Sequence, residues 1–174
     1  MSVPDISNTM IISSYPTNSF HALNIIRLIR CVPADATILS VSTNLYEKVQ
    51  TVINRLEDKK NIRIVRDDNR RYDTGKWCLG IMTLRKEFKN LRHLKWILLA
   101  NDSIFMLRRV PELYDALASN MFDIGGITSS NGWPLKNEDR DFHVQSYLRV
   151  FTPDAIELWT NYSCGLPIRH TQVR

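Results

Sequence analysis

Two patterns of hydrophobic positions alternate along the first half of this chain. Continuous apolar runs are typical of strands buried on both faces of a parallel sheet. They occur at Met10–Ser14, Thr37–Ser42, Ile62–Val65 and Trp96–Ala100. Between these runs, apolar residues recur every three or four positions, as on one face of a helix. This spacing predicts helices at Ser19–Cys31, Leu45–Leu56 and Gly75–Phe88. Strands that alternate with helices predict βαβ crossovers and a mostly parallel sheet.

The second half of the chain has a less regular pattern. We expect short strands at Ile104–Leu107 and His143–Phe151, a strand or turn at Asp123–Thr128, and helices at Pro111–Asn120 and Pro153–Tyr162. Neither an internal repeat nor a convincing interdomain linker interrupts the sequence. The pattern therefore predicts one α/β domain over residues 1–174, a layered sandwich with a mostly parallel central sheet and an irregular C-terminal half.

The composition is that of an ordinary globular protein, with 44% hydrophobic and 24% charged residues among 174. No apolar stretch is long enough to span a bilayer, and the N-terminus lacks the layout of a signal peptide. The three cysteines, Cys31, Cys78 and Cys164, are odd in number and widely spaced. We therefore expect reduced thiols in a cytoplasmic protein, and neither disulfides nor a zinc site.

The formal charge of +5 is concentrated in two stretches, Asp58–Arg71 and Arg85–Lys95. Three kinds of partner or surface fit such a balance: nucleic acid, solvated helix faces, or an anionic small molecule such as a nucleoside diphosphate. Aromatic residues are not interleaved with the basic ones, as they are in platforms that bind single strands. This disfavours nucleic acid and leaves the other two interpretations open.

The segment Asn101-Asp102-Ser103 comes directly after the fourth apolar run. In open α/β sheets, ligands bind at the carboxyl ends of the strands, so Asp102 is placed where a ligand is expected. Its carboxylate is the best candidate in the chain for binding a hard divalent cation, Mg²⁺ or Mn²⁺. The alternative is a plain turn, because Asn, Asp and Ser all favour turns.

The loop after the third strand runs from Arg66 to Trp77 and reaches the same edge of the sheet. Gly75 at a helix start permits close approach of an anionic partner to free backbone amides. Its surroundings match neither the dinucleotide-binding fingerprint nor the P-loop, which disfavours nicotinamide cofactors and ATPase chemistry. The alternative is a solvated loop in which Asp73 only caps the helix.

A third polar cluster, Asp139–Tyr147, joins carboxylates, a histidine and hydroxyls just before an apolar run. A general base for an acceptor hydroxyl requires such a carboxylate or histidine. The Gly-containing segment Asp123–Ser130 either lines the same pocket or makes a tight turn. The remaining histidines have no acidic or cysteine neighbours and are interpreted as structural or exposed; they are His21, His93 and His170.

In this order the clusters resemble the rhamnan synthesis protein F family of glycosyltransferases, from about Ile11 to Phe151. The motifs that carry the resemblance are Val41-Ser42-Thr43, Asn69, Tyr72–Trp77, Asn101-Asp102-Ser103, Gly126-Ile127-Thr128 and His143-Val144-Gln145-Ser146-Tyr147. Each motif is short, but together they follow the family's order along most of the chain.

The resemblance implies a GT-A fold, which is a Rossmann-like three-layer sandwich. It also implies transfer of a hexose of rhamnose or glucose type from a nucleoside diphosphate sugar to a carbohydrate acceptor in polysaccharide biosynthesis, with inversion and a divalent cation (Mn²⁺ or Mg²⁺). Residues 9–100 would form the donor half and residues 101–174 the metal and acceptor half. The chain is short for this fold, so a non-catalytic nucleotide-sugar-binding module of a larger protein is the alternative.

The family's functional positions can be carried over residue by residue. Asn101-Asp102-Ser103 stands in place of an Asp-x-Asp motif, and since its first position is Asn101, Asp102 is the main metal ligand. His143 is either a second metal ligand or a base. Asp141 is the first choice as catalytic base and Asp139 the second. The implied acceptor or pocket residues are Gly126, Thr128, Gln145 and Ser146. The implied donor-binding residues are Ser13, Ser14, Tyr15, Thr43, Arg70, Arg71, Asp73, Gly75, Lys76, Asn101, Asp102 and Ser103.

Overall fold

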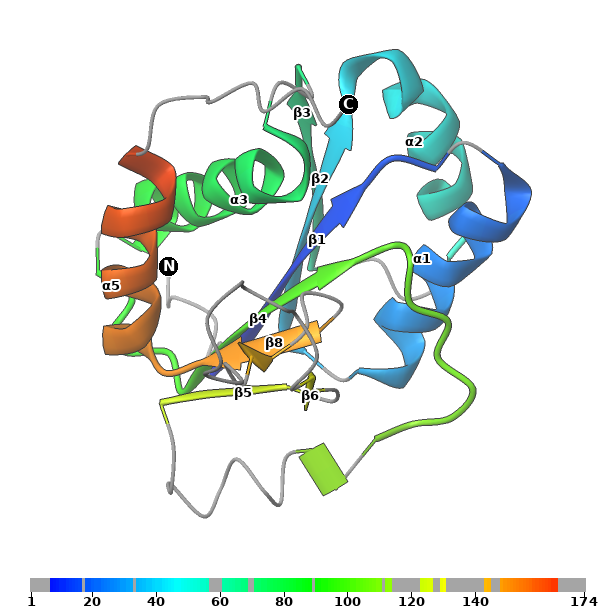
Figure 1. Ribbon diagram of the computed structural model, residues 1–174. Helices are drawn as coiled ribbons and strands as arrows, with labels where there is room; N and C mark the ends of the chain where they lie inside the picture. Colours follow the sequence, from blue (N-terminus) through cyan, green and yellow to red (C-terminus); the bar gives the residue numbers. More distant parts are fainter. Residues whose placement is uncertain are drawn as a thin grey trace, which may run out of the picture.

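The computed structural model arranges the chain around a central sheet of six strands, in the order β3-β2-β1-β4-β8-β5 (Figure 1). A separate two-stranded sheet pairs β6 with β7. The residues that the structure describes are 7–16, 18–32, 34–56, 61–68, 71–88, 90–110, 112–113, 123–126, 129–130, 143–144 and 148–165.

Four neighbouring strands of the central sheet, β3, β2, β1 and β4, are parallel to one another. β8 runs antiparallel to β4, and β5 runs antiparallel to β8. The prediction of a mostly parallel sheet is therefore confirmed. The strands are β1 (Asn8–Ser14), β2 (Ala36–Ser42), β3 (Ile62–Asp67), β4 (Trp96–Asn101), β5 (Ile124–Gly126), β6 (Ser129–Ser130), β7 (His143–Val144) and β8 (Leu148–Phe151).

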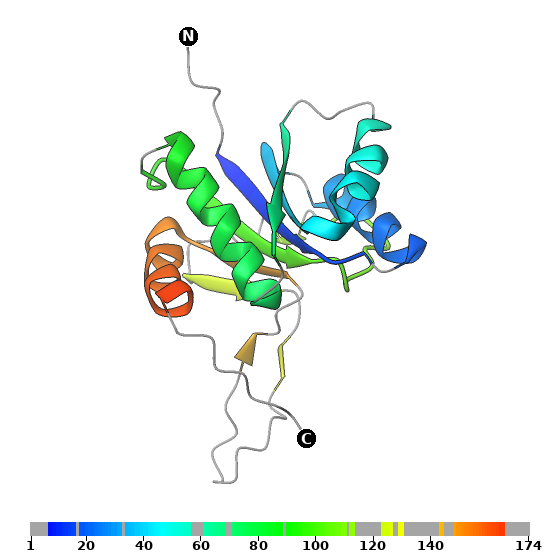
Figure 2. The ribbon, with the colours of Figure 1, turned by 90° about the horizontal axis from the view of Figure 1, so that it is seen from above.

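Helices cover both faces of the sheet (Figure 2). Successive side chains of a strand point to opposite faces, and β1 shows the result. Met10 and Ile12 join the apolar core under α1 and α2, whereas Ile11 joins the core under α3 and α5. The helices are α1 (Ser19–Cys31), α2 (Tyr46–Asn54) after a 3₁₀ turn at Thr43–Leu45, α3 (Tyr72–Phe88) and α5 (Pro153–Gly165).

Most elements expected from the sequence are present with small changes in length. α1 has the predicted bounds, because Asn18 caps it by accepting a hydrogen bond from the backbone N–H of His21 at 3.0 Å. α3 begins at Tyr72 and so includes Gly75, which was expected to mark its start. β3 continues to Asp67, beyond the expected end at Val65.

The expected strand at Ile104–Leu107 is wrong, since this segment pairs with no strand. Its apolar residues instead pack on α1: Met106 is buried in the core, and Phe105 stacks on Phe20 with ring centroids 5.2 Å apart. The segment then continues beside α1, where the N–H of Val110 donates to the carbonyl of Cys31. Packing against a helix therefore satisfies the apolar pattern that we attributed to a strand.

Two further expectations are met only in part. His143–Phe151 is not one strand, because His143–Val144 and Leu148–Phe151 belong to different sheets; residues 145–147 lie outside the described part. Glu112 and Leu113 are helical, but the rest of the expected helix Pro111–Asn120 lies outside the described residues. The helix expected at Pro153–Tyr162 is present and continues to Gly165.

The expectation of reduced cysteines is wrong for two of the three. Cys78 of α3 and Cys164 of α5 form a disulfide, with Cα atoms 5.7 Å apart, and Cys31 is free. The two bonded residues are 86 positions apart, and only the packing of α5 against α3 brings them together. Because disulfides persist in oxidising surroundings, this bond counts against the expected cytoplasmic location. No helix in the described part of the chain is long and apolar enough to cross a membrane.

Candidate functional site

The strand order reverses direction between β1 and β4. The chain steps outward from β1 to β2 and β3, and then returns to the other side of β1 to form β4. The crevice at such a switch point, at the carboxyl ends of the strands, is where open α/β sheets bind ligands. Ser13 and Ser14 end β1 here, and Asn101 ends β4.

Asp102 ties the end of β4 to the end of β1. Its Oδ2 accepts hydrogen bonds from Ser14 Oγ at 3.0 Å and from the backbone N–H of Tyr15 at 2.8 Å. Its backbone carbonyl accepts a hydrogen bond from Asn24 Nδ2 of α1 at 2.7 Å. Asp102 is only 7% exposed. Its carboxylate is held by two groups at the end of β1, and its backbone is held by α1.

Burial sets the protonation behaviour of Asp102. Loss of water raises the pKa of its carboxyl group above the usual 3.8, and the hydrogen bonds from Tyr15 and Ser14 oppose this rise. His21 of α1 lowers the same pKa by its charge, and Asp73 raises it. The charged form of Asp102 is therefore costly in the folded protein, and a cation at this position would relieve that cost.

Asp73 lies in the first turn of α3 and faces the same strand ends from the other side of the sheet. Its Oδ1 accepts a hydrogen bond from Ser13 Oγ at 2.5 Å, and its Oδ2 accepts one from Asn101 Nδ2 at 3.2 Å. Ser13 and Ser14 point to opposite faces of β1, and each binds one carboxylate. Two acids thus flank the end of β1, and the helix dipole of α3 favours the negative charge of Asp73.

Lys76 lies beside these acids and is 1% exposed. Its Nζ is 3.7 Å from Asp67 Oδ2 and 5.9 Å from the centre of the Tyr15 ring. Burial lowers the pKa of Lys76, and the charges of Asp67, Asp73 and Asp102 act in the opposite direction. The ammonium group therefore balances part of the acidic charge at this edge of the sheet.

Arg71 and Gly75 take part in contacts that the sequence did not reveal. The guanidinium of Arg71 donates to the carbonyls of Ser163 and Cys164, which end α5. A Cβ on Gly75 would lie 2.7 Å from Arg71 Cβ, so the missing side chain of Gly75 makes room for Arg71. Tyr72, between them, has a φ of 48° and is 77% exposed; such strained backbone often occurs beside functional sites.

The sequence analysis missed one residue of the site, Asp67, and gave no sign of Arg149, a half-buried arginine on β8 beside β4. Asp67 is the last residue of β3 and contacts Lys76; the rule that drew attention to Asp102, a carboxylate at a strand end, would have found it. Arg149 of β8 pairs with Leu99 of β4 and with Gly126 of β5. Burial lowers the pKa of Arg149, and its Nε has no hydrogen-bond partner among the residues that the structure describes. No local pattern marks an arginine within an apolar strand as part of a site.

The structure gathers many of the expected residues at one edge of the sheet. Thr43 Oγ1 donates to the carbonyl of Asp67 at 3.0 Å, and the N–H of Ser103 donates to Asn101 Oδ1 at 3.2 Å. Gly126 ends β5, two strands from β4. Arg70, Thr128, Asp139, Asp141, Gln145, Ser146 and the side chain of His143 lie outside the described part, so their roles stay predictions.

The oxygen atoms at the switch point suit a hard divalent cation. The carboxylates of Asp73 and Asp102 and the hydroxyls of Ser13 and Ser14 are the ligand types that Mg²⁺ and Mn²⁺ bind. The described residues contain no group of three or more His, Cys, Asp or Glu side chains that would hold a metal alone. Mg²⁺ is commonly bound by one or two carboxylates and substrate phosphates, and this site matches that arrangement.

Comparison with known proteins bears on the fold. No protein-family model matches the chain, and no curated protein matches it. A 4-diphosphocytidyl-2C-methyl-D-erythritol synthase from Anaerococcus prevotii superposes with a TM-score of 0.67 and 13% identity, over 96% of this chain and 79% of that one. The inositol-1-phosphate CTP transferase of T. maritima gives 0.56 and 13%, over 94% and 78%.

Mouse xyloside xylosyltransferase 1 is a more distant match, with a TM-score of 0.47 and 10% identity over 87% of this chain and 68% of that one. The fold is a Rossmann-like sandwich of the GT-A type. This confirms the expected fold class. At these identities the comparisons show the fold alone.

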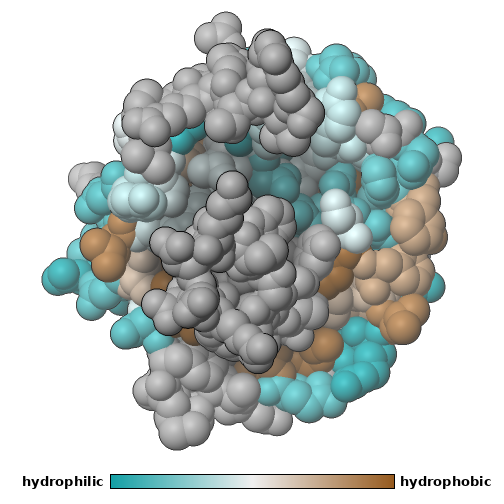
Figure 3. Space-filling view, in the orientation of Figure 1, coloured by the Kyte–Doolittle hydropathy of each residue, from teal (hydrophilic) through white to brown (hydrophobic). Residues whose placement is uncertain are grey.

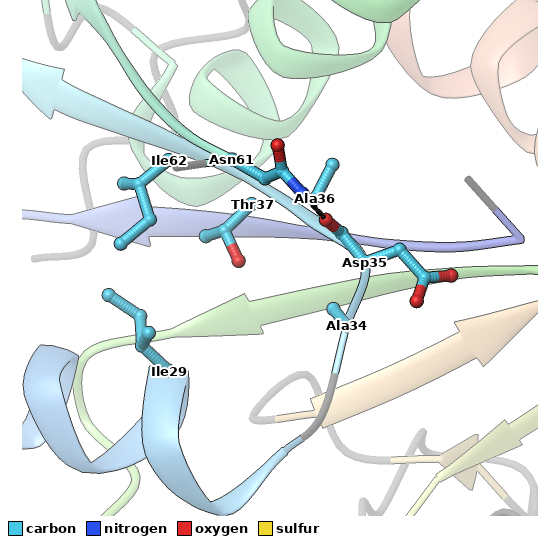
Figure 4. Close-up of a pocket in the computed structure, with 7 residues that line it drawn as sticks. All are labelled: Ile29, Ala34, Asp35, Ala36, Thr37, Asn61 and Ile62. Atoms are coloured by element: carbon cyan, nitrogen blue, oxygen red, sulfur yellow. Dashed lines mark hydrogen bonds between the residues drawn. The ribbon is translucent and has the colours of Figure 1, made fainter. Parts of the chain in front are cut away.

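A small cavity of about 140 Å³ lies at the opposite, amino edge of the sheet (Figure 4). Asp35 lines it, but its Oδ2 already accepts hydrogen bonds from the backbone N–H groups of Ser7 and Asn8. Its carbonyl accepts another from Asn61 Nδ2 at 2.7 Å. These polar groups connect β2 to its neighbours, so we assign no ligand to this cavity.

Proposed function

We propose that this chain is a glycosyltransferase of the rhamnan synthesis protein F type that binds the diphosphate of a nucleotide sugar at the carboxyl ends of β1 and β4. One observation carries the proposal: the carboxylates of Asp73 and Asp102 flank the end of β1 at the switch point of the sheet, where Asp73 is bonded to Ser13 and Asp102 to Ser14. The donor is a hexose of rhamnose or glucose type, and the acceptor is a carbohydrate.

In the proposed reaction Asp102 and Asp73 hold a divalent cation, with His143 as a further ligand. When bound, this cation stabilises negative charge on the leaving nucleoside diphosphate. The protein's own residues orient the donor. Ser14 and the N–H of Tyr15 hold the Asp102 carboxylate in place, and Lys76 limits repulsion among the neighbouring acids.

Arg149 supplies a second positive charge in this proposal. Lys76 is paired with Asp67, and Arg71 is engaged with the end of α5. Arg149 shares the face of Leu99, whose neighbour along that face of β4 is Asn101. Its Nε, which has no hydrogen-bond partner within the described part of the chain, would donate to a phosphate oxygen beside β4.

For the acceptor, an inverting transfer requires a base on the face of the sugar opposite to the leaving group. Asp141 is our first candidate for this base and Asp139 the second, from the motif that they share with His143. Such a base typically accelerates a reaction about 10²- to 10⁴-fold. Gly126, Thr128, Gln145 and Ser146 are proposed to line the acceptor pocket.

A second candidate function is nucleotidyl transfer, because the two solved structures with the higher TM-scores are named as a diphosphocytidyl synthase and a CTP transferase. The products distinguish the two reactions. Glycosyl transfer or donor hydrolysis releases a nucleoside diphosphate, whereas nucleotidyl transfer to a sugar phosphate releases pyrophosphate. A non-catalytic module would bind the nucleotide and release neither product.

The test is a panel of nucleotide sugars, and of CTP with sugar phosphates, each with and without Mn²⁺. Thermal shift detects binding, since a ligand that binds the folded state stabilises it more as its concentration rises relative to Kd, and product analysis detects turnover. We expect nucleoside diphosphate release that depends on Mn²⁺. Release of pyrophosphate alone, or binding without any product, would contradict the proposal.

A further inference from the structure

One side of the molecule carries apolar side chains that are exposed and close together. Phe20 of α1 is 54% exposed and Leu107 is 80% exposed. Figure 3 shows hydrophobic surface on this side of the molecule, over α1 and the segment after β4, with hydrophilic residues around it. We name this region the α1 surface. It consists of Phe20, Leu23, Arg27 and Arg30 of α1 and of Phe105, Leu107, Arg108 and Arg109.

The order of residues along α1 gives this surface its character. Phe20, Leu23, Arg27 and Arg30 are spaced by three, four and three positions, which places them on one stripe of the helix. The apolar residues of the stripe lie near the N-terminus of α1, which follows the carboxyl end of β1. The basic residues lie near the C-terminus of α1. The apolar part therefore lies on the side of the candidate site.

The segment after β4 extends this stripe and is fixed to it. The Phe105 ring stacks on Phe20, and the Arg27 guanidinium lies 4.8 Å from the centre of the same ring. Phe20 and Arg27 are about 10 Å apart along the helix, since each residue rises ~1.5 Å, and both contact the Phe105 ring. Arg27 also donates to the carbonyl of Met106. These contacts hold the side chains of Phe20, Phe105 and Arg27 in fixed positions relative to one another.

We propose that the α1 surface docks on a bilayer that contains anionic phospholipids. Phe and Leu side chains beside Arg are the composition of protein surfaces that lie in the headgroup region. Arg30, Arg108 and Arg109 are exposed and match the negative charge of the lipid phosphates, and Arg108 is also paired with Glu112. The candidate site then faces the membrane, although docking itself does not depend on the proposed function.

The test measures co-sedimentation of the protein with vesicles of phosphatidylcholine, with or without phosphatidylserine. We expect binding to the anionic vesicles that weakens as salt is added, because salt screens charges near the surface. Each of Arg30→Gln and Arg109→Gln should weaken binding about 5-fold. Leu107→Ser should weaken vesicle binding by about 10-fold or more, since binding would move the exposed apolar surface of this leucine from water into the bilayer.

Leu158→Ser and Arg92→Gln are matched controls, because both residues are exposed on the side of α3 and α5. They should leave vesicle binding unchanged. The proposal is overturned if anionic vesicles do not bind the protein, or if the controls weaken binding as much as the α1 variants. It is also overturned if the wild-type protein is a dimer that Leu107→Ser dissociates without changing vesicle binding. The α1 surface would then contact a second copy of the chain.

Discussion

Ser14 Oγ donates a hydrogen bond to Asp102 Oδ2 across the carboxyl ends of β1 and β4, at 3.0 Å. The two residues are 88 positions apart in the chain, and their contact closes the crevice at the point where the strand order reverses. The site is therefore a product of sheet topology, with each carboxylate positioned by a hydroxyl of β1.

The first prediction concerns Asp102→Asn. Asparagine keeps the size of the side chain and an oxygen that can accept the Ser14 and Tyr15 hydrogen bonds, but it loses the charge that attracts a cation. We expect turnover to decrease by about 10²-fold or more, on the scale of a lost electrostatic contact, with an unchanged circular dichroism spectrum. Asp154→Asn, at an exposed acid of α5, is the control. Activity close to wild type in the Asp102 variant would remove Asp102 from the mechanism.

The same residue predicts how stability depends on pH. The pKa of Asp102 in the folded protein lies above its usual value of 3.8. At pH values between the pKa of the unfolded chain and that of the folded protein, the folded state therefore binds more protons than the unfolded chain. The contribution of Asp102 to the free energy of unfolding therefore decreases as pH rises through this interval. Urea titrations from pH ~4 upward should show the Asp102→Asn variant gaining stability relative to wild type. A difference that stays constant with pH would contradict the assignment.

Arg149 offers a way to separate function from stability. Burial lowers its pKa and its Nε lacks a partner in the described segments, so the charged group costs the fold some stability. We expect Arg149→Gln to unfold at the same temperature as wild type or higher, while the KM for the nucleotide donor increases about 10-fold. Arg149→Lys should restore part of the affinity. A variant that melts earlier and binds the donor normally would show a structural role only.

The disulfide between Cys78 and Cys164 should stabilise the packing of α5 on α3. A disulfide of this kind typically contributes about 2–4 kcal/mol, so Cys164→Ser is expected to lower the free energy of unfolding by that amount. Peptide mapping without reductant checks that the bond exists, and denaturation with and without reductant measures its effect. Cys31→Ser is the control, since Cys31 is free and its loss should leave the response to reductant unchanged.

Gly80 of α3 packs directly against Ile11 of β1. A Cβ at this position would collide with the Cγ2 of Ile11 in β1, whereas a Cβ at Gly165 would meet no atom within 4 Å. Gly80→Ala should therefore destabilise the protein by about 1–3 kcal/mol through overpacking. Gly165→Ala at the end of α5 should be nearly neutral. Equal melting temperatures for the two variants would contradict this packing.

The sequence by itself determined the elements, because their signals are local. Four apolar runs located the parallel strands, and the three-to-four spacing located α1 with its bounds intact. The strand-end rule also predicted that Asp102 would lie at the carboxyl edge. Burial on one or both faces dictates the residue types within an element, so these features can be identified without the rest of the molecule.

The tertiary structure alone decided which distant residues meet. It paired Cys78 with Cys164, engaged Arg71 with the end of α5, and packed Ile104–Leu107 on a helix where a strand was expected. It also brought Asp67 beside Lys76 and placed Arg149 on the strand next to β4. Such contacts join elements that are far apart in the chain, and they depend on how helices dock on the sheet. No periodicity within one segment records that docking, because an apolar residue packs equally well against a strand or a helix.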